Sequence, residues 1–447
     1  MRIFNAIYMC CVGVCVPLFT ACSGKVASEL ESGSAEVINI DDARQQETMT
    51  FSSIFEAPQV VVLETNDSCV IRSIYSMEVY KDNLYILDDV AQALYVFDKK
   101  GNFLHRIGHR GRGHDEYVEL SDFSIDRDNG IVYLWDEAKD KALKYNIATG
   151  KFMPGIKTER NGLRCFCMQY HGGNIYVNRA SMDAEPGNYM LKEINAETGE
   201  QTDSLLTADE YNKGWNSQLR LQHSFFYSRN TDAPKFIGMF SDKIAAITDN
   251  VVETAYIVKS KDLATPDEVK KMLDDYIKNS GKYDFSVLND KKRISRFSWF
   301  VEFDSLVSFQ YSVGDDIGYL LYDRKTKETT VYRQMVNDYI YGKNNIPTNL
   351  CYADEKGVWA LLRQDNIPYF IKNIVSTGKL DKNIDQYDKL KQLTNDSNKR
   401  KMIYRVLSCY RAGQWGSLAQ IARIGSAEYC RFRGVTACLC SFLFGLS

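Results

Sequence analysis

The sequence lacks the features that mark several protein classes. Its 447 residues include only 8 prolines and 5 histidines, and beyond the N-terminal segment no stretch reaches the ~18 uninterrupted apolar residues of a membrane-spanning helix. The 55 Lys and Arg residues are outnumbered by 58 Asp and Glu residues. The basic face that neutralises nucleic-acid phosphates is therefore missing, and we expect no nucleic-acid partner. Because 45% of the residues are hydrophobic, the chain is also too apolar to be disordered.

Common enzyme motifs are missing as well. The sequence has no Gly-x-Ser-x-Gly elbow, no phosphate-binding loop and no His-Glu-x-x-His pair, so it points to no serine hydrolase, nucleotide-binding enzyme or zinc protease of the usual kinds. We assign no catalytic residue, metal ligand or cofactor from the sequence.

The N-terminus has the pattern of an export signal. Arg2 is followed by an almost wholly apolar stretch over 3–19, and Thr20 and Ala21 precede Cys22. This pattern predicts a signal peptide over 1–21 and not a spanning helix. The ending resembles a bacterial lipobox, and this resemblance implies that Cys22 is lipidated and anchors the chain to a membrane. Residues 22–56 begin with small and polar side chains, and we expect them to form a flexible tether.

The body of the sequence repeats a pattern of short strands and tight turns. Apolar and aromatic runs bounded by Asp, Asn and Gly predict strands, and they recur in six units of about 56 residues. Six such units over 57–398 favour a six-bladed, all-β propeller with four-stranded antiparallel blades over a two-sheet sandwich. The runs at the centres of the units lie at 83–88, 130–136, 173–177, 242–247, 306–309 and 357–362.

One segment has a helical pattern instead. Thr265-Pro-Asp-Glu268 offers a capping hydroxyl, a proline at the first helical position and a glutamate that can bond back to the cap. We predict an inserted helix near 265–279, whose apolar stripe packs on the propeller rim or docks a partner. The stripe consists of Val269, Met272, Leu273, Tyr276 and Ile277.

The segment Ile107-Gly-His-Arg-Gly-Arg-Gly-His-Asp-Glu-Tyr117 resembles the linker between blades of NHL-type propellers. Together with the lipobox and the Val-Val-Leu-Glu run at 61–64, it resembles the six-bladed propeller lipoproteins of Bacteroides-like bacteria, a family of unknown function. The resemblance implies an outer-membrane lipoprotein of the cell envelope, either on the periplasmic face or on the cell surface. It also implies structural roles in the linker for Gly108, Gly111, Gly113, Glu116 and Tyr117.

Basic and titratable groups crowd the same linker. His109, Arg110, Arg112 and His114 could hold an anionic ligand through guanidinium groups and loop amides. The alternative, which we favour, is a solvated structural turn in which Glu116 bonds backbone amides and Tyr117 packs between blades. Most aromatic residues belong to the blade cores, although Trp135, Trp215 and Trp299 could instead stack on sugar rings.

Residues 399–447 differ from the rest of the chain. They carry eight Lys or Arg residues against the single acid Glu428, and four of the twelve cysteines. No strand and turn pattern follows Asn398. We expect an atypical basic tail, either a natural extension or the product of a frameshift that removed the strand closing the last blade. Among the other cysteines, Cys69 and Cys351 could form a disulfide, whereas Cys165 and Cys167 should point to opposite faces of a strand.

Two classes of function fit these observations. The first is a non-enzymatic scaffold that binds a glycan, peptide or protein on the propeller. The second is a propeller enzyme of the lactonase or lyase type, with a metal on the central axis. Candidate inward-facing acids for the second class are Asp122, Asp242 and Asp304.

Overall fold

The computed structural model describes residues 35–56, 59–154, 156, 165, 167–178, 188–215, 226–248, 251–278, 285–303, 305–341, 349–354, 357–362 and 406–411. All of them belong to one compact unit, Ser32–Ser447. The predicted signal, Cys22, and the tail beyond 411 lie outside the described residues. In the described part, no helix is long and apolar enough to cross a membrane.

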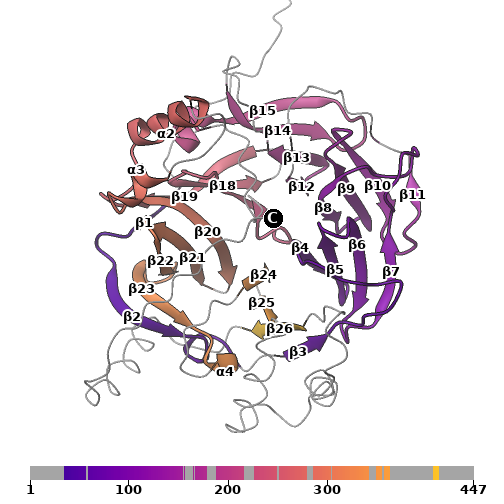
Figure 1. Cartoon of the computed structure of the whole chain (residues 1–447), viewed down its shortest axis with the longest axis horizontal. Helices are drawn as coiled ribbons and strands as arrows, with labels where there is room; N and C mark the ends of the chain where they lie inside the picture. The colour runs from indigo at the N-terminus through magenta and orange to yellow at the C-terminus, as the bar shows by residue number, and fades with distance from the viewer. Residues whose placement is uncertain are drawn as a thin grey trace, which may run out of the picture. The chain divides into compact units, whose positions relative to one another are not determined.

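The strands form six sheets in a β-propeller arrangement (Figure 1). The first sheet has the order β4-β5-β6-β7 and the second the order β8-β9-β10-β11. Neighbouring strands within both are antiparallel. Their bounds are β4 Ser76–Tyr80, β5 Asn83–Asp88, β6 Ala93–Asp98, β7 Phe103–Ile107, β8 Leu120–Asp126, β9 Ile131–Asp136, β10 Lys141–Asn146 and β11 Phe152–Met153.

The third, fourth and fifth sheets follow in chain order. The third is β12-β13-β14-β15, the fourth contains β16 to β19, and the fifth contains β20 to β23. Their bounds are β12 Met168–His171, β13 Asn174–Asn178, β14 Tyr189–Asn195, β15 Gln201–Thr207, β16 Phe226–Tyr227, β17 Lys235–Phe236, β18 Lys243–Thr248, β19 Val251–Lys259, β20 Ile294–Phe303, β21 Leu306–Val313, β22 Asp316–Asp323 and β23 Glu328–Val336.

The N-terminal strands run along the outer edges of the last three sheets. β1 (Glu36–Asn39) pairs in parallel with β19, and β2 (Arg44–Thr50) pairs in parallel with β23. The expectation of a flexible tether through residue 56 is therefore wrong for this part. So is the expectation of uniform four-stranded antiparallel blades, because these two sheets have five strands. Each added strand has one buried apolar residue, Ile38 in β1 and Met49 in β2. Backbone hydrogen bonds to the neighbouring strand therefore hold β1 and β2 in place, and the sequence shows little apolar pattern that would predict them.

The sixth sheet combines a strand from the N-terminal part of the chain with the last described strands. Its order is β24-β25-β26-β3, with β3 Gln59–Val62, β24 Asn349–Asp354, β25 Gly357–Leu362 and β26 Val406–Arg411. The expectation that no strand follows Asn398 is wrong, since β26 pairs with β25 on one side and with β3 on the other. The polar and cysteine residues Ser408, Cys409 and Arg411 interrupt the apolar pattern that would have marked the strand.

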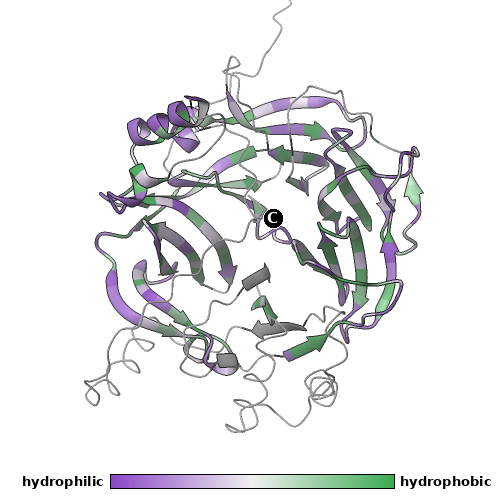
Figure 2. Ribbon diagram, in the orientation of Figure 1, coloured by the Kyte–Doolittle hydropathy of each residue, from purple (hydrophilic) through white to green (hydrophobic). Residues whose placement is uncertain are grey.

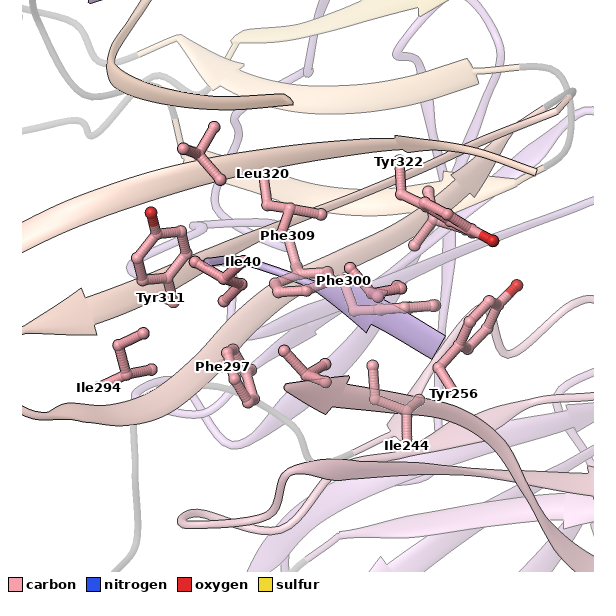
Figure 3. Close-up of a cluster of buried hydrophobic side chains, with 14 of the residues drawn as sticks. Ile40, Ile244, Tyr256, Ile294, Phe297, Phe300, Phe309, Tyr311, Leu320 and Tyr322 are labelled. Carbon is pink, nitrogen blue, oxygen red and sulfur yellow. The ribbon is translucent and has the colours of Figure 1, made fainter. Parts of the chain in front are cut away.

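Apolar side chains pack between adjacent sheets. Figure 2 shows hydrophobic residues along the strands of the sheets, and Figure 3 shows the cluster between the fourth and fifth sheets. There Ile244 and Tyr256 meet Phe297, Phe300 and Phe309, all of them buried. The ring planes of Phe297 and Phe309 are nearly perpendicular, with centroids 5.2 Å apart, a favourable geometry for aromatic pairs. Such contacts fix each blade against its neighbours.

Helices lie outside the blades and are short except for α2 (Pro266–Lys278). The others are η1 (Phe51–Ser53), α1 (Ala208–Asn212), α3 (Ser286–Asn289) and α4 (Asp338–Tyr341). α2 confirms the predicted helix, and it follows the fourth sheet and precedes the fifth. Val269 and Met272 are buried against Trp215, Phe240 and Leu288. These residues of the stripe therefore pack on the body of the protein.

The predicted capping box of α2 is also present. The Thr265 amide donates to Glu268 Oε2 at 3.0 Å, and the Glu268 amide donates to Thr265 Oγ1 at 3.3 Å. Lys291 and Arg293 also contact the Glu268 carboxylate, at 2.8 and 3.1 Å. Burial opposes ionisation of this group, but the hydrogen bonds from Lys291, the Thr265 backbone and Arg293 outweigh it and lower the pKa of Glu268 to about 2.

This lowered pKa predicts a pH-dependent contribution of Glu268 to stability. A carboxyl whose pKa is lower in the folded than in the unfolded chain stabilises the fold above its unfolded pKa of ~4.3. That stability is lost as the pH falls toward 2. We expect Glu268→Gln to cost about 1–2 kcal/mol at pH 7, and the difference from wild type to shrink between pH 5 and pH 2 in chemical unfolding measurements. Glu328→Gln, on an exposed strand end, is the control. A Glu268→Gln cost that does not change with pH would contradict the prediction.

Candidate functional site

The first strands of the sheets meet around the centre of the ring. β4 contacts β8, β8 contacts β12, β16 contacts β20, β20 contacts β24, and β24 contacts β4. Several polar side chains on these inner strands are buried: Ser76, Glu78, Asp122, Ser124 and Gln169. Since buried polar groups are costly unless they are paired, their partners define what the centre can do.

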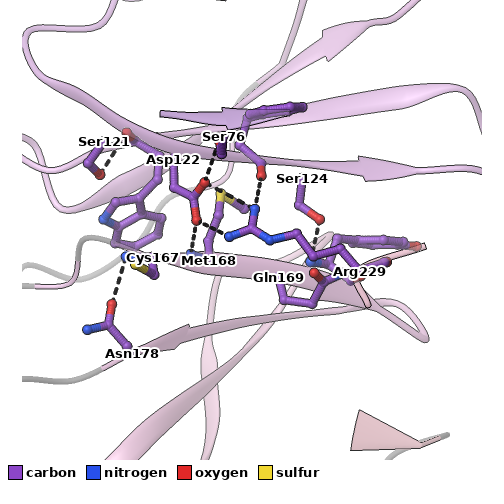
Figure 4. A network of polar contacts seen from close by, with 12 residues as sticks. Ser76, Ser121, Asp122, Ser124, Cys167, Met168, Gln169, Asn178 and Arg229 are labelled. Atoms are coloured by element: carbon purple, nitrogen blue, oxygen red, sulfur yellow. Dashed lines mark hydrogen bonds and ion pairs between the residues drawn. The ribbon is translucent and has the colours of Figure 1, made fainter. Parts of the chain in front are cut away.

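Asp122 and Arg229 form a buried, bidentate ion pair at this centre (Figure 4). Arg229 Nη2 lies 2.7 Å from Asp122 Oδ2, and Nη1 lies 3.1 Å from Oδ1. The aspartate side chain is 0% exposed and the arginine side chain 7%. Burial alone would lower the pKa of Arg229, but the charge and hydrogen bonds of Asp122 raise it above its ordinary value. The Arg229 guanidinium is thus held in its charged form.

The pair connects several sheets. Asp122 lies on β8, whereas Arg229 follows β16, two sheets further along the ring. Asp122 Oδ2 also accepts from the Met168 amide of β12 at 2.9 Å, and Arg229 Nη1 also donates to the Phe123 carbonyl at 2.9 Å. Ser76 of β4 lies 3.4 Å from Asp122 Oδ1. One carboxylate therefore ties together elements of four sheets.

A second ion pair lies within electrostatic range of the first, and in it Glu78 is buried whereas Arg127 is partly exposed. Arg127 Nη2 contacts Glu78 Oε2 at 3.0 Å, and Arg127 Nη1 donates to the Val79 carbonyl at 2.9 Å. Burial raises the pKa of Glu78, and the charges of Arg127 and Arg229 oppose this shift. Both arginines thus favour the charged form of Glu78 against the effect of its burial.

The three acids considered for an axial metal do not share one environment. Asp122 lies on the inner strand β8, but its carboxylate is paired with the Arg229 guanidinium. Asp242 lies 3.3 Å from Lys213, and its side chain is 35% exposed. Asp304 lies outside the described residues. Among the residues that the structure describes, no three His, Cys, Asp or Glu side chains are grouped so as to hold a metal ion.

In the linker, Glu116 and Tyr117 make structural contacts. Glu116 Oε2 accepts from the Gly113 amide at 2.7 Å, and Glu116 Oε1 lies 2.9 Å from His109 Nε2. Tyr117 is fully buried between the first and second sheets and donates to the Gln92 carbonyl at 2.8 Å. A Cβ on Gly111 would meet the Glu116 carboxylate, which would have to move from its place in the linker.

The four basic residues of the linker do not converge on one point. His109 contacts Glu116, and Arg110 Nε donates to the Val118 carbonyl at 3.0 Å. Arg112 is exposed. His114, also exposed, lies edge-on to Phe152 with ring centroids 5.4 Å apart. These contacts are separate from one another, so they do not support an anion site formed jointly by His109, Arg110, Arg112 and His114.

Two of the three tryptophans considered for sugar stacking belong to the core. Trp135 is 0% and Trp215 2% exposed, and Trp135 Nε1 donates to the Cys165 carbonyl. Trp299, on β20, is partly exposed and has a backbone φ of +56°. Of these three tryptophans, only Trp299 is therefore partly exposed to solvent.

Three cysteines, Cys69, Cys165 and Cys167, have buried side chains. Cys69, Cys165 and Cys167 form no disulfide, so the Cys69–Cys351 pairing considered as a possibility is not formed. Cys165 and Cys167 pack into clusters on opposite sides of the third sheet, as expected, although both precede β12 and lie outside its strand. Burial raises the pKa of the Cys69 thiol to about 12, which makes it a poor nucleophile.

The sequence reasoning missed the arginines at the centre. Arg229 lies in a short segment that carries no motif, and its partner is more than a hundred residues away. Glu78 had a detectable signal, because it is a charged residue inside the otherwise apolar strand Ser76-Met-Glu-Val-Tyr80. A lone acid on a core strand indicates a buried cation nearby.

Residues 35–405 of the chain match a family described as a domain of unknown function, DUF4934. None of the curated proteins matches the chain. The matched segment ends one residue before β26.

Solved structures from Bacteroides species have a similar fold. A Bacteroides fragilis protein described as a "Putative exported protein" is 20% identical, with a TM-score of 0.62, and the match covers 85% of this chain and all of that one. A member of the DUF4221 family from Bacteroides vulgatus is 10% identical, with a TM-score of 0.44, over 80% of this chain and 98% of that one. The first match supports the fold alone, and the second is too weak to carry an argument.

Proposed function

We propose that this chain, which belongs to the DUF4934 family, is a lipid-anchored, six-bladed propeller that binds a ligand or partner in the bacterial cell envelope without transforming it. The six sheets support six blades, with β3 and β26 completing the last blade from opposite ends of the chain. In closed propellers such pairing of distant strands protects the sheet edges.

Export and anchoring are supported by the N-terminal pattern. The apolar run over 3–19 and the Thr-Ala-Cys22 ending have the features of a lipoprotein signal. The Bacteroides fragilis protein of similar fold is described as exported, which fits the same destination. The alternatives of periplasmic face and cell surface stay open.

The observation that carries the non-enzymatic proposal is the bidentate pair of Asp122 and Arg229. A propeller lactonase or lyase would need its inward carboxylates free to ligate a metal or move a proton. Asp122 instead has both oxygens engaged, by a guanidinium at 2.7 and 3.1 Å and by the Met168 amide. Breaking such a buried pair is costly, so Asp122 is suited to holding the blades together.

Acyl labelling tests the anchor. Cells expressing the full chain are fed an alkyne-tagged fatty acid, and we expect label and membrane fractionation for wild type and loss of both for Cys22→Ser. Cys15→Ser, within the signal, is the matched control and should keep the label. Protease added to intact cells then separates the two possible faces of the membrane. An unlabelled wild-type chain would contradict the anchor.

Binding arrays test the second half of the proposal. The full-length protein in detergent is applied to arrays of envelope and dietary glycans and of peptides. We expect saturable retention by one ligand class, with the retained ligand recovered unchanged. Conversion of a retained ligand would favour the enzyme alternative, and failure of every class to bind would contradict a scaffold for glycans or peptides.

A further inference from the structure

His105 is packed between the outer edges of the first two sheets. It lies on β7, the outer strand of the first sheet, and the turn over 146–151 joins β10 to β11 in the second sheet. The backbone of Ile147, in this turn, hydrogen-bonds the His105 imidazole. Gly150 is so close that a Cβ on it would lie 3.5 Å from His105 Cδ2 and 3.6 Å from the Arg106 carbonyl oxygen. The imidazole therefore joins the two sheets at the outer rim of the ring (Figure 1).

The surroundings of this histidine do not compensate a positive charge. His105 Nε2 is buried and has no hydrogen-bond partner among the described residues. Neither 103–107 nor 146–152 contains Asp or Glu, and the charged neighbours along the chain, Arg106 and Lys151, are exposed cations. Burial lowers the pKa of His105 against the opposing effect of the Ile147 backbone, and no charged group contributes to the shift. Protonation would therefore turn Nε2 into a buried donor without an acceptor.

The outer edge of the second sheet is short at this contact. β11 has two residues, and both pair with β10. Ile147 belongs to the buried core between the first and second sheets, whereas Phe152 of β11 is only partly buried. Segments with few strand pairs and partial burial open at a lower free energy than core strands do. Loss of the contact with His105 is therefore expected to free this edge before the rest of the blade.

We propose that the contact of His105 with Ile147 and Gly150 is an acid-sensitive rim latch, which holds the outer edges of the first two blades together at neutral pH and releases them when the imidazole takes up a proton. The folded chain disfavours the charged ring. The stabilising effect of the latch is therefore present above the ordinary histidine pKa of ~6.5 and is lost as the pH falls toward the lower pKa of the folded chain. The rim latch does not depend on the proposed scaffold function.

The two histidines of the linker at the same junction face carboxylates instead. His109 Nε2 lies 2.9 Å from Glu116 Oε1, and His114 Nδ1 lies 3.7 Å from Asp115 Oδ1. A proton on either of these rings adds an attraction to the neighbouring acid, whereas a proton on His105 adds an uncompensated charge. Mild acid should therefore loosen the rim while the linker between the two blades stays in place.

Hydrogen–deuterium exchange of the full-length protein, followed by mass spectrometry, tests the rim latch. Exchange is measured at pH 7.5 and at pH 5, with the times scaled for the intrinsic dependence of the exchange rate on pH. In wild type, we expect the protection of peptides over 103–107 and 146–153 to fall at least about threefold at pH 5 and to recover at pH 7.5. Peptides over the inner strand β8 should keep their protection.

Substitutions at His105 separate the latch from other effects of acid. His105→Phe removes the titrating group and keeps a ring, so the protection of the two rim peptides should be the same at both pH values, whatever its level. His105→Gln, which is uncharged and keeps a hydrogen-bonding amide, serves if the Phe variant does not fold. His114→Phe is the matched control: it removes a histidine of the same junction whose side chain is 87% exposed, and it should respond to pH like wild type.

Three results would overturn the rim latch. The first is equal protection of the wild-type rim peptides at both pH values. The second is a loss of protection at pH 5 in the His105 variants that matches the loss in wild type. The third is a loss of the same size in β8, since the whole chain would then be unfolding. A pH response that is confined to the rim peptides and abolished by the His105 substitutions establishes the latch.

Discussion

Asp122→Asn should destabilise the folded chain by about 3–5 kcal/mol, because it leaves Arg229 buried without its counter-charge. The substitution keeps the shape of the side chain and removes the charge that holds the guanidinium at 2.7 and 3.1 Å. Thermal and urea unfolding of the full chain measure the loss. Combining Asp122→Asn with Arg229→Met should recover at least ~1 kcal/mol, since removing both charges relieves the unpaired one.

The control for this prediction is Asp242→Asn. Asp242 also faces a cation, Lys213 at 3.3 Å, but its side chain is 35% exposed. Exposed pairs contribute about 0–1 kcal/mol, so we expect at most that cost. Similar costs for the two substitutions would show that the central pair does not hold the blades together.

The second large effect concerns the closing strand. A chain that stops after Arg405 lacks β26, which forms six residue pairs with β25 and four with β3. At about 0.5–1.5 kcal/mol per backbone hydrogen bond, the loss should reach about 5 kcal/mol, and two sheet edges would be exposed to aggregation. We expect a large fall in the unfolding midpoint or insoluble protein.

A chain that stops after Arg411 is the matched control, since it keeps β26 and removes the rest of the tail. It should unfold like the full chain. If the two truncated chains unfold alike, β26 does not close the ring. Because β26 completes the sixth sheet, the expected loss of a closing strand through a frameshift is not found in the structure.

The sequence was most informative where local patterns determine the structure. The apolar runs at 83–88 and 357–362 coincide with β5 and β25, because turns and side-chain alternation specify such strands locally. The capping residues Thr265 and Glu268 likewise located α2. By contrast, β1, β2 and β26 form through backbone pairing with distant strands. Their own side chains carry little apolar signal, so no local pattern revealed them.

Most residues of the candidate site could not be predicted from the sequence. Asp122 was selected as an inward acid, and the structure places it there, but its partner Arg229 comes from another sheet. The histidine and arginine cluster at 109–114 drew attention because its members are adjacent in sequence, although their side chains make separate contacts.

The most direct test of binding without turnover is the mass balance of a bound glycan. A glycan that the arrays retain is held with a stoichiometric amount of the full-length protein for a day, released by denaturation and analysed by mass spectrometry. Our account predicts that all of it returns at its original mass and length. Shortened or unsaturated oligosaccharides that form with the protein and not in its absence would contradict it and establish an enzyme.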